Sequence, residues 1–334
     1  MRKAGLPLPY AVVDHAGNGL FGPSLRSRAV VALARTLIRP LLGVLPLNAT
    51  VMRCASLLDR GAALMPLSKE SSFERVTLAY CEAEIVRADD EATIADGALL
   101  YLHGGGFIAG GLNTHRRMIT VLAQLTGLPV MHVAYRKLPG ATIRESVADC
   151  VKAYEWLLQH GAHPKHVVVA GESVGGFLAF AAVIAARDQG MPAPGGLAAI
   201  SPWLDLDCAA KSAEARAQTE ALLPIAMFET VSRLGAEVDG VLDSTLSPAL
   251  ADVRGLPPTL LVALRSEVLR PDAEAMAARL GGAGVPCVLH LWRGQIHAFS
   301  ALFPGSTEGW EVLSDLSEFV RARVAAQPAQ PHAG

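Results

Sequence analysis

The sequence predicts an α/β fold with a mostly parallel central sheet, helices on both of its faces, and a helical cap. From about residue 98, short apolar runs alternate with longer helical stretches, which is typical of a parallel sheet. The run Ala98–Leu102 is apolar throughout, as expected for a strand buried on both faces. With 334 residues, 51 % of them hydrophobic, the chain is long and apolar enough for one large core with an inserted lid.

The expected elements follow one another in a regular order. Two short strands, 75–80 and 84–86, precede the buried run. Further strands are expected at 129–134, 166–170, 197–200, 259–263 and 286–292, and helices at 114–126, 143–160, 174–188, 271–280 and 307–324. Residues 207–247 interrupt this alternation with charged residues among alanines, and Pro224 divides them into two helical stretches. We therefore expect an insertion there.

These breaks predict the domain organisation. Residues 1–70 are assigned to an N-terminal cap segment, 71–206 to the first part of the core, 207–247 to a cap insertion and 248–326 to the second part of the core. The tail, 327–334, has no apolar content to anchor it and is expected to be disordered.

The apolar stretch 28–65 raises the question of a membrane interaction. Arginines and prolines interrupt it, so it lacks the roughly 20 consecutive apolar residues of a transmembrane helix. Two interpretations remain: helices packed as a lid over the core, which the helical spacing favours, and a basic amphipathic patch that makes weak contact with a membrane surface. We expect no secretory signal, because Pro7, Pro9 and Asp14 break the N-terminal apolar run.

Charge and cysteine content exclude several kinds of partner. The formal net charge is -2 and no long basic run occurs, which argues against a nucleic-acid partner and favours a small-molecule substrate. The five cysteines are scattered, without a C-x-x-C pair or the spacing of a zinc site. We expect them to be free thiols in a reducing, cytoplasmic compartment. We also expect no metal and no cofactor.

The most informative motif is Gly171–Gly176, which reads Gly-Glu-Ser-Val-Gly-Gly and lies between an expected strand and an expected helix. A G-x-S-x-G sequence in this setting predicts a nucleophile elbow, in which small residues let the turn close and Ser173 projects from its tip. The alternative role for Ser173 is that of a helix N-cap.

A second motif supplies hydrogen-bond donors. Three consecutive glycines in His103–Phe107 directly follow the buried strand, and their N–H groups are not shielded by side chains. Such groups can stabilise negative charge on a reacting oxygen. The N–H group of Val174, next to the candidate nucleophile, would add another donor.

A serine nucleophile needs a base, and the chain order points to His297. This residue lies in Gly294–Phe299, between the last expected strand and the last expected helix, where loops gather at the carboxyl edge of the sheet. The order serine, acid, histidine then places the acid before His297.

Three carboxylates follow the strand at 259–263 and precede the histidine: Glu267, Asp272 and Glu274. We choose Glu267 because it lies on the loop leaving the strand, and we keep Asp272 as the reserve acid. Asp272 and Glu274 resemble first-turn charges that a helix dipole favours.

Taken together, the motifs resemble those of the bacterial hormone-sensitive-lipase-like esterases, which have the α/β-hydrolase fold. The likeness covers roughly residues 98–325 and rests on His103–Phe107, Tyr135–Arg136, Gly171–Gly176, Ser201–Asp205 and Gly294–Phe299. The resemblance implies an oxyanion hole formed by the N–H groups of Gly105, Gly106 and Val174. It also implies a cap built from residues 1–70 and 207–247. Glu172 departs from the family pattern, where aspartate is more common before the serine.

The resemblance also implies a carboxylic-ester hydrolase that acts on short to medium acyl esters through Ser173, Glu267 and His297. An amidase or an acyltransferase with the same triad stays open. A non-catalytic small-molecule receptor is a further alternative, against which the presence of His297 counts. The natural ester, its stereochemistry and the oligomeric state, with a homodimer as one option, are not determined by the sequence.

Overall fold

A computed structural model describes residues 9–15, 23–64, 71–213 and 219–325. Nine strands in this part of the chain form one sheet in the order β1-β11-β10-β7-β6-β4-β5-β3-β2. Neighbouring strands are parallel except β2 with β3 and β3 with β5. The strands are β1 (Ala11–His15), β2 (Ser72–Thr77), β3 (Glu82–Arg87), β4 (Ala98–Leu102), β5 (Val130–Ala134), β6 (Val167–Glu172), β7 (Gly196–Ile200), β10 (Thr259–Leu264) and β11 (Cys287–Trp292).

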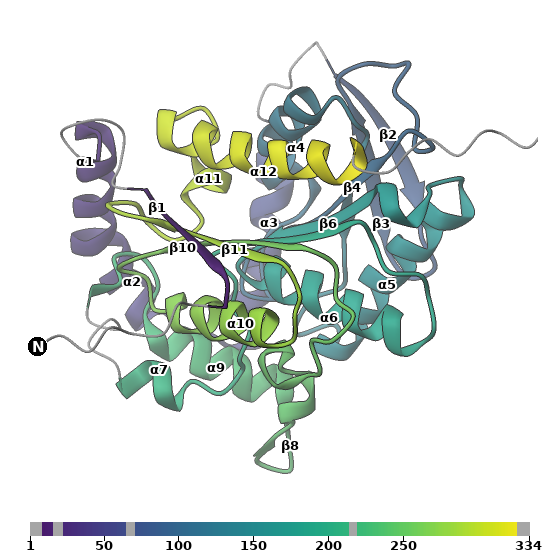
Figure 1. Ribbon diagram of the computed structural model, residues 1–334. Helices are drawn as coiled ribbons and strands as arrows, with labels where there is room; N and C mark the ends of the chain where they lie inside the picture. Colours follow the sequence, from purple (N-terminus) through teal and green to yellow (C-terminus); the bar gives the residue numbers. More distant parts are fainter. Residues whose placement is uncertain (1–8, 16–22, 65–70, 214–218, 326–334) are drawn as a thin grey trace, which may run out of the picture.

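Helices cover both faces of this sheet (Figure 1). On one face lie α4 (Leu112–Thr126) and α12 (Thr307–Ala325). On the other lie α5 (Ile143–Gln159), α6 (Val174–Asp188) and α10 (Arg270–Gly282). The predicted α/β fold with a mostly parallel sheet is therefore confirmed.

The central strand β4 shows how the two layers are built. Leu100 and Leu102 belong to one apolar cluster, with α5 and α6, whereas Leu99 and Tyr101 belong to the other, with α4 and α12. Successive side chains of a strand point to opposite faces, so a strand that is apolar throughout joins two layers.

The outermost strand, β1, was not expected. Residues 1–70 were assigned to the cap segment, but Ala11–His15 pairs in parallel with β11 and extends the core sheet at its edge. The sequence signal is weak, because the strand has only five residues and most of its side chains are exposed. Residues 1–8 and the tail 327–334 lie outside the described residues.

Two further groups of helices come from the segments that the sequence assigns to a cap. The N-terminal group comprises α1 (Leu25–Leu33), a π-helical turn (Ala34–Ile38), α2 (Arg39–Val44) and α3 (Ala49–Ala62). The segment between β7 and β10 contains α7 (Ala209–Ala213), α9 (Ile225–Ala236) and the small hairpin of β8 (Glu237–Val238) and β9 (Val241–Leu242). Short helical turns complete the described chain at Pro164–His166, Ser244–Leu246, Pro248–Leu250 and Phe299–Leu302 (α11). Among the described residues, no helix combines the length and the apolarity that crossing a bilayer requires.

Candidate active site

The sharp turn between β6 and α6 places Ser173 at the carboxyl edge of the sheet. Ser173 has φ 57° and ψ -121°, a backbone conformation that is uncommon for a residue with a side chain. A Cβ atom on Gly175 would lie 1.9 Å from the Leu102 carbonyl oxygen, so this position excludes any side chain. Ser173 is the N-cap residue of α6, but its side chain makes no capping hydrogen bond. The interpretation of this side chain as a helix cap is therefore wrong.

The structure brings Ser173, His297 and Glu267 together. Ser173 Oγ lies 2.9 Å from His297 Nε2, and His297 Nδ1 lies 3.1 Å from Glu267 Oε2. All three side chains are buried. The second oxygen of Glu267 accepts a hydrogen bond of 2.7 Å from the Leu264 N–H at the end of β10, which holds the carboxylate in place.

Asp272, the reserve acid, lies elsewhere. Its Oδ1 pairs with Lys211 Nζ at 3.0 Å, and its Oδ2 accepts hydrogen bonds from the N–H groups of Leu204 and Asp205. Burial raises the pKa of Asp272, while Lys211 and the two N–H groups act in the opposite direction. These contacts join α10 to α7 and to the loop after β7. Asp272 therefore stabilises the packing of these elements and does not contact His297.

The electrostatic surroundings of His297 favour its protonated form. Burial lowers the pKa of His297, but the hydrogen bond that its Nδ1 donates to Glu267 and the negative charge of Glu267, with smaller effects of Glu220 and Glu172, raise the pKa and outweigh burial. The net result is a pKa above the usual value. Glu220 comes from the segment between β7 and β10, and its carboxylate accepts a hydrogen bond from the Val268 N–H, next to Glu267.

The glycine loop after β4 depends on a backbone conformation that only glycine adopts readily. Gly105 has φ +118°, and a Cβ atom there would lie 2.3 Å from the Ala109 carbonyl oxygen. Gly106 has φ +64°. Within the described residues, the N–H groups of Gly105 and Gly106 make no backbone hydrogen bond, and both glycines line the same cavity as Ser173. Val174 is the first residue of α6, where N–H groups have no partner within the helix.

Glu172, the residue before the serine, holds this loop from behind. One carboxylate oxygen accepts a hydrogen bond from the Gly104 N–H and lies 2.8 Å from His115 Nε2. The other accepts a hydrogen bond of 2.7 Å from the Tyr101 hydroxyl. Burial lowers the pKa of His115, but the charge of Glu172 and the hydrogen bond to it raise the pKa above its usual value. The pair therefore fastens the glycine loop to α4.

The same network reaches the N-terminal helices. Asp59 on α3 accepts hydrogen bonds from the Thr114 N–H and from the Asn113 side chain at the start of α4, and Thr114 Oγ1 lies 3.0 Å from His115 Nδ1. Asp59 and His115 were not expected from the sequence. Glu172 could have been singled out from the sequence, because it stands next to the candidate nucleophile and replaces the aspartate that is more common at this position.

An apolar cavity of about 440 Å³ opens beside Ser173. Its lining combines three parts of the chain. The N-terminal helices and their loops contribute Leu42, Leu45, Leu47, Val51, Ala55 and Leu58; the segment before β10 contributes Leu222, Leu223, Met227, Phe228 and Val231; and the core contributes Trp203, Ala298, Ala301 and Leu302 beside the polar residues. Cavities of this size bury most of a small apolar ligand.

The comparison with known families identifies the fold. Residues 99–301 match the model of a family described as having the alpha/beta hydrolase fold. The chain belongs to this α/β-hydrolase family.

Individual relatives agree with this assignment. The chain is similar to Esterase LipU of Mycobacterium tuberculosis, with 35 % identity over 79 % of this chain and 91 % of the relative. It is similar to an Acetyl-hydrolase of Streptomyces hygroscopicus, with 35 % identity over 74 % of this chain and 81 % of the relative. A crystal structure of an esterase from the bacterial hormone-sensitive lipase family matches 90 % of this chain and 99 % of its own, with 30 % identity and a TM-score of 0.79. The resemblance inferred from the motifs is confirmed.

Within this α/β hydrolase, we propose Glu267 rather than Asp272 as the acid partner of His297. Because the pKa of His297 is raised, we expect the acid limb of kcat/KM against pH to have its midpoint above about 6.5, the usual histidine value. Glu267→Gln removes the negative charge that raises this pKa, so the midpoint should move to lower pH. We expect kcat to fall by about 10²–10⁴-fold.

Two control variants accompany this test. Glu318→Gln changes an exposed glutamate on α12 and should alter neither the midpoint nor kcat. Asp272→Asn should lower the thermal stability, because it leaves the Lys211 charge buried without its partner, while the midpoint of the pH profile stays in place. If Asp272→Asn moved the midpoint and Glu267→Gln did not, the assignment of the acid would be wrong.

Proposed function

We propose that this protein is a carboxylic-ester hydrolase in which Ser173, His297 and Glu267 form the catalytic triad. The observation that carries the proposal is the continuous chain of contacts from Ser173 Oγ to His297 Nε2, at 2.9 Å, and from His297 Nδ1 to Glu267, at 3.1 Å. Ser173, at one end of this series of contacts, lines an apolar cavity. The named relatives are esterases and an acetyl-hydrolase.

The proposed reaction follows from these positions. His297 Nε2 accepts the proton of Ser173 as Oγ attacks the ester carbonyl, and Glu267 stabilises the imidazolium that forms. The N–H groups of Gly105, Gly106 and Val174 donate hydrogen bonds to the oxyanion. His297 then protonates the leaving alcohol, and water repeats the sequence on the acyl-enzyme.

Replacing the nucleophile tests the mechanism. Ser173→Ala should lower kcat/KM for p-nitrophenyl butyrate by more than about 10³-fold, because no other group can form the acyl-enzyme. Circular dichroism should show an unchanged fold, since alanine needs less space than serine. Turnover by the variant at the rate of the unaltered protein would exclude Ser173 as the nucleophile.

The cavity supports a preference for short to medium acyl chains. The helices α2, α3 and α9 contribute side chains to its lining, and we propose that they form the cap over Ser173. A cavity of about 440 Å³ buries a small apolar group, and we propose that its walls, rather than its volume, limit the length of the acyl chain.

A panel of p-nitrophenyl esters from acetate to palmitate tests this preference. We expect kcat/KM to be highest for the short and medium esters and to fall steeply for palmitate. Matched anilides in the same panel should be hydrolysed slowly, and added alcohol should not divert the acyl group from water. Faster hydrolysis of the anilides would favour an amidase, and transfer to the alcohol would favour an acyltransferase.

We further propose that the N-terminal helices make weak contact with an anionic membrane surface. Leu25, Leu41 and Val44 are exposed, as are Arg26 and Arg28. Residues 24–58 contain no Asp or Glu. Exposed apolar side chains next to arginines suit the boundary between acyl chains and acidic headgroups.

Co-sedimentation with vesicles tests this contact. We expect the protein to bind vesicles that contain phosphatidylserine, and to bind pure phosphatidylcholine less, with binding that weakens as salt is added. The double variant Arg26→Glu/Arg28→Glu should reduce the bound fraction several-fold. The control Arg144→Glu/Arg254→Glu changes two exposed arginines outside these helices and should bind normally. Equal binding of both double variants would exclude the proposed surface.

A further inference from the structure

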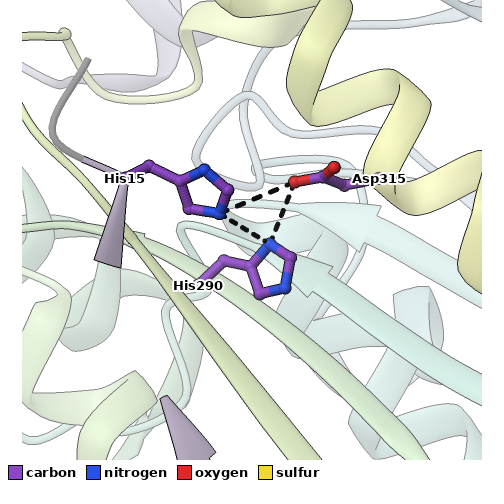
Figure 2. A group of neighbouring side chains, drawn as sticks. All are labelled: His15, His290 and Asp315. Carbon is purple, nitrogen blue, oxygen red and sulfur yellow. Dashed lines mark hydrogen bonds and ion pairs between the residues drawn. The ribbon is translucent and has the colours of Figure 1, made fainter. Parts of the chain in front are cut away.

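Two histidines and an aspartate converge at the β1 edge of the sheet, outside the residues that line the cavity. His15 comes from β1, His290 from β11 and Asp315 from α12 (Figure 2). His15 Nε2 lies 3.1 Å from His290 Nδ1, and His290 Nδ1 lies 3.0 Å from Asp315 Oδ2. The third side of the triangle, His15 Nε2 to Asp315 Oδ2, is 3.7 Å.

A single proton on His290 Nδ1 can make a full hydrogen bond with only one of its two close neighbours. A neutral imidazole nitrogen either donates one hydrogen bond or accepts one. If His290 Nδ1 donates to Asp315, it cannot also accept from His15 Nε2, although that atom is equally near. The three atoms also lie close enough together to bind one cation.

We propose that His15, His290 and Asp315 bind a divalent transition-metal ion of the zinc type. Zinc binds histidine nitrogen at about 2.0–2.1 Å and carboxylate oxygen at about 2.0–2.2 Å, so tetrahedral donor atoms stand about 3.3 Å apart. The three separations here, 3.0, 3.1 and 3.7 Å, lie around this value. Nitrogen donors favour zinc and its neighbours in the first transition row over magnesium or calcium.

The surroundings suit an ion that enters from solvent. The side chains of His15, His290 and Asp315 are 23 %, 15 % and 28 % exposed, which leaves room for water in the fourth coordination position. The His15 ring stacks on Trp292 with a centroid distance of 4.3 Å and an interplanar angle of 5°, which orients the ring.

Charges near the cluster do not compete for its carboxylate. Arg265 and Arg293 pair with Asp14, the residue before His15. Among the described residues, Asp315 pairs with the two histidines and with no lysine or arginine. The negative charge of Asp315 is therefore available to a metal ion that the two histidines also bind.

The position predicts a structural role for the ion. Asp315 and His290 belong to α12 and β11, whereas His15 belongs to an edge strand that, among the described strands, hydrogen bonds only to β11. An ion bound by all three residues would hold β1 on the sheet. Because binding favours the folded state, the melting temperature should rise with zinc concentration.

Metal titration of the full chain tests the proposal. After treatment with EDTA and removal of the chelator, we expect calorimetry to show one Zn²⁺ bound per chain, and Co²⁺ to give the visible absorption bands of a tetrahedral site. Mg²⁺ should give neither a binding signal nor a rise in melting temperature. Absence of Zn²⁺ binding by the unaltered protein would overturn the proposal.

Variants locate the site. His290→Ala and the nearly isosteric Asp315→Asn should each weaken Zn²⁺ binding by at least about 10-fold and abolish the zinc-dependent rise in melting temperature. The control His163→Gln changes an exposed histidine outside the cluster and should bind Zn²⁺ normally. Asp315→Asn keeps the size of the side chain, so circular dichroism and esterase activity should be unchanged. Unaltered Zn²⁺ affinity in both cluster variants would show that the ion binds elsewhere.

Discussion

The carboxylate of Glu172 is the contact on which the geometry of the active site depends. Its two oxygens bind Tyr101 on β4, the Gly104 N–H in the glycine loop, and His115 on α4. Glu172 is also the last residue of β6, directly before Ser173. The loop that carries the candidate oxyanion donors is therefore held in place by the neighbour of the candidate nucleophile. Displacement of the glycine loop would therefore displace Ser173 as well.

This contact also links the proposed cap to the candidate active site. His115 lies beside Thr114, whose N–H donates to Asp59 on α3. From the other side, Glu220 in the segment before β10 accepts a hydrogen bond from the Val268 N–H, next to Glu267. Each of the two proposed cap segments thus hydrogen bonds to a part of the chain adjoining the site. Cap placement and site geometry are connected through polar contacts as well as through the apolar lining of the cavity.

Local sequence patterns were sufficient to predict much of the fold and of the candidate site. The strand, turn and helix around Ser173 follow from a short apolar run, small residues and an alanine-rich run. His297 could be chosen among ten histidines because the order of loops along the chain places it at the same sheet edge as Ser173. Glu267 and Asp272 were harder to separate, since only five positions divide them. The structure places Glu267 beside His297 and Asp272 beside Lys211.

The sequence by itself determined the alternation of strands and helices in the core from β2 onward, the elbow with its glycine loop, and the residue types available for catalysis, because each depends on neighbours a few positions away. Only the tertiary structure decided which distant side chains meet. Asp59 reaches α4, β1 joins β11, and His15 approaches His290 and Asp315 across 275 or more positions. Local sequence patterns do not predict such contacts, because the contacts depend on how distant strands pair and how helices pack in the folded chain.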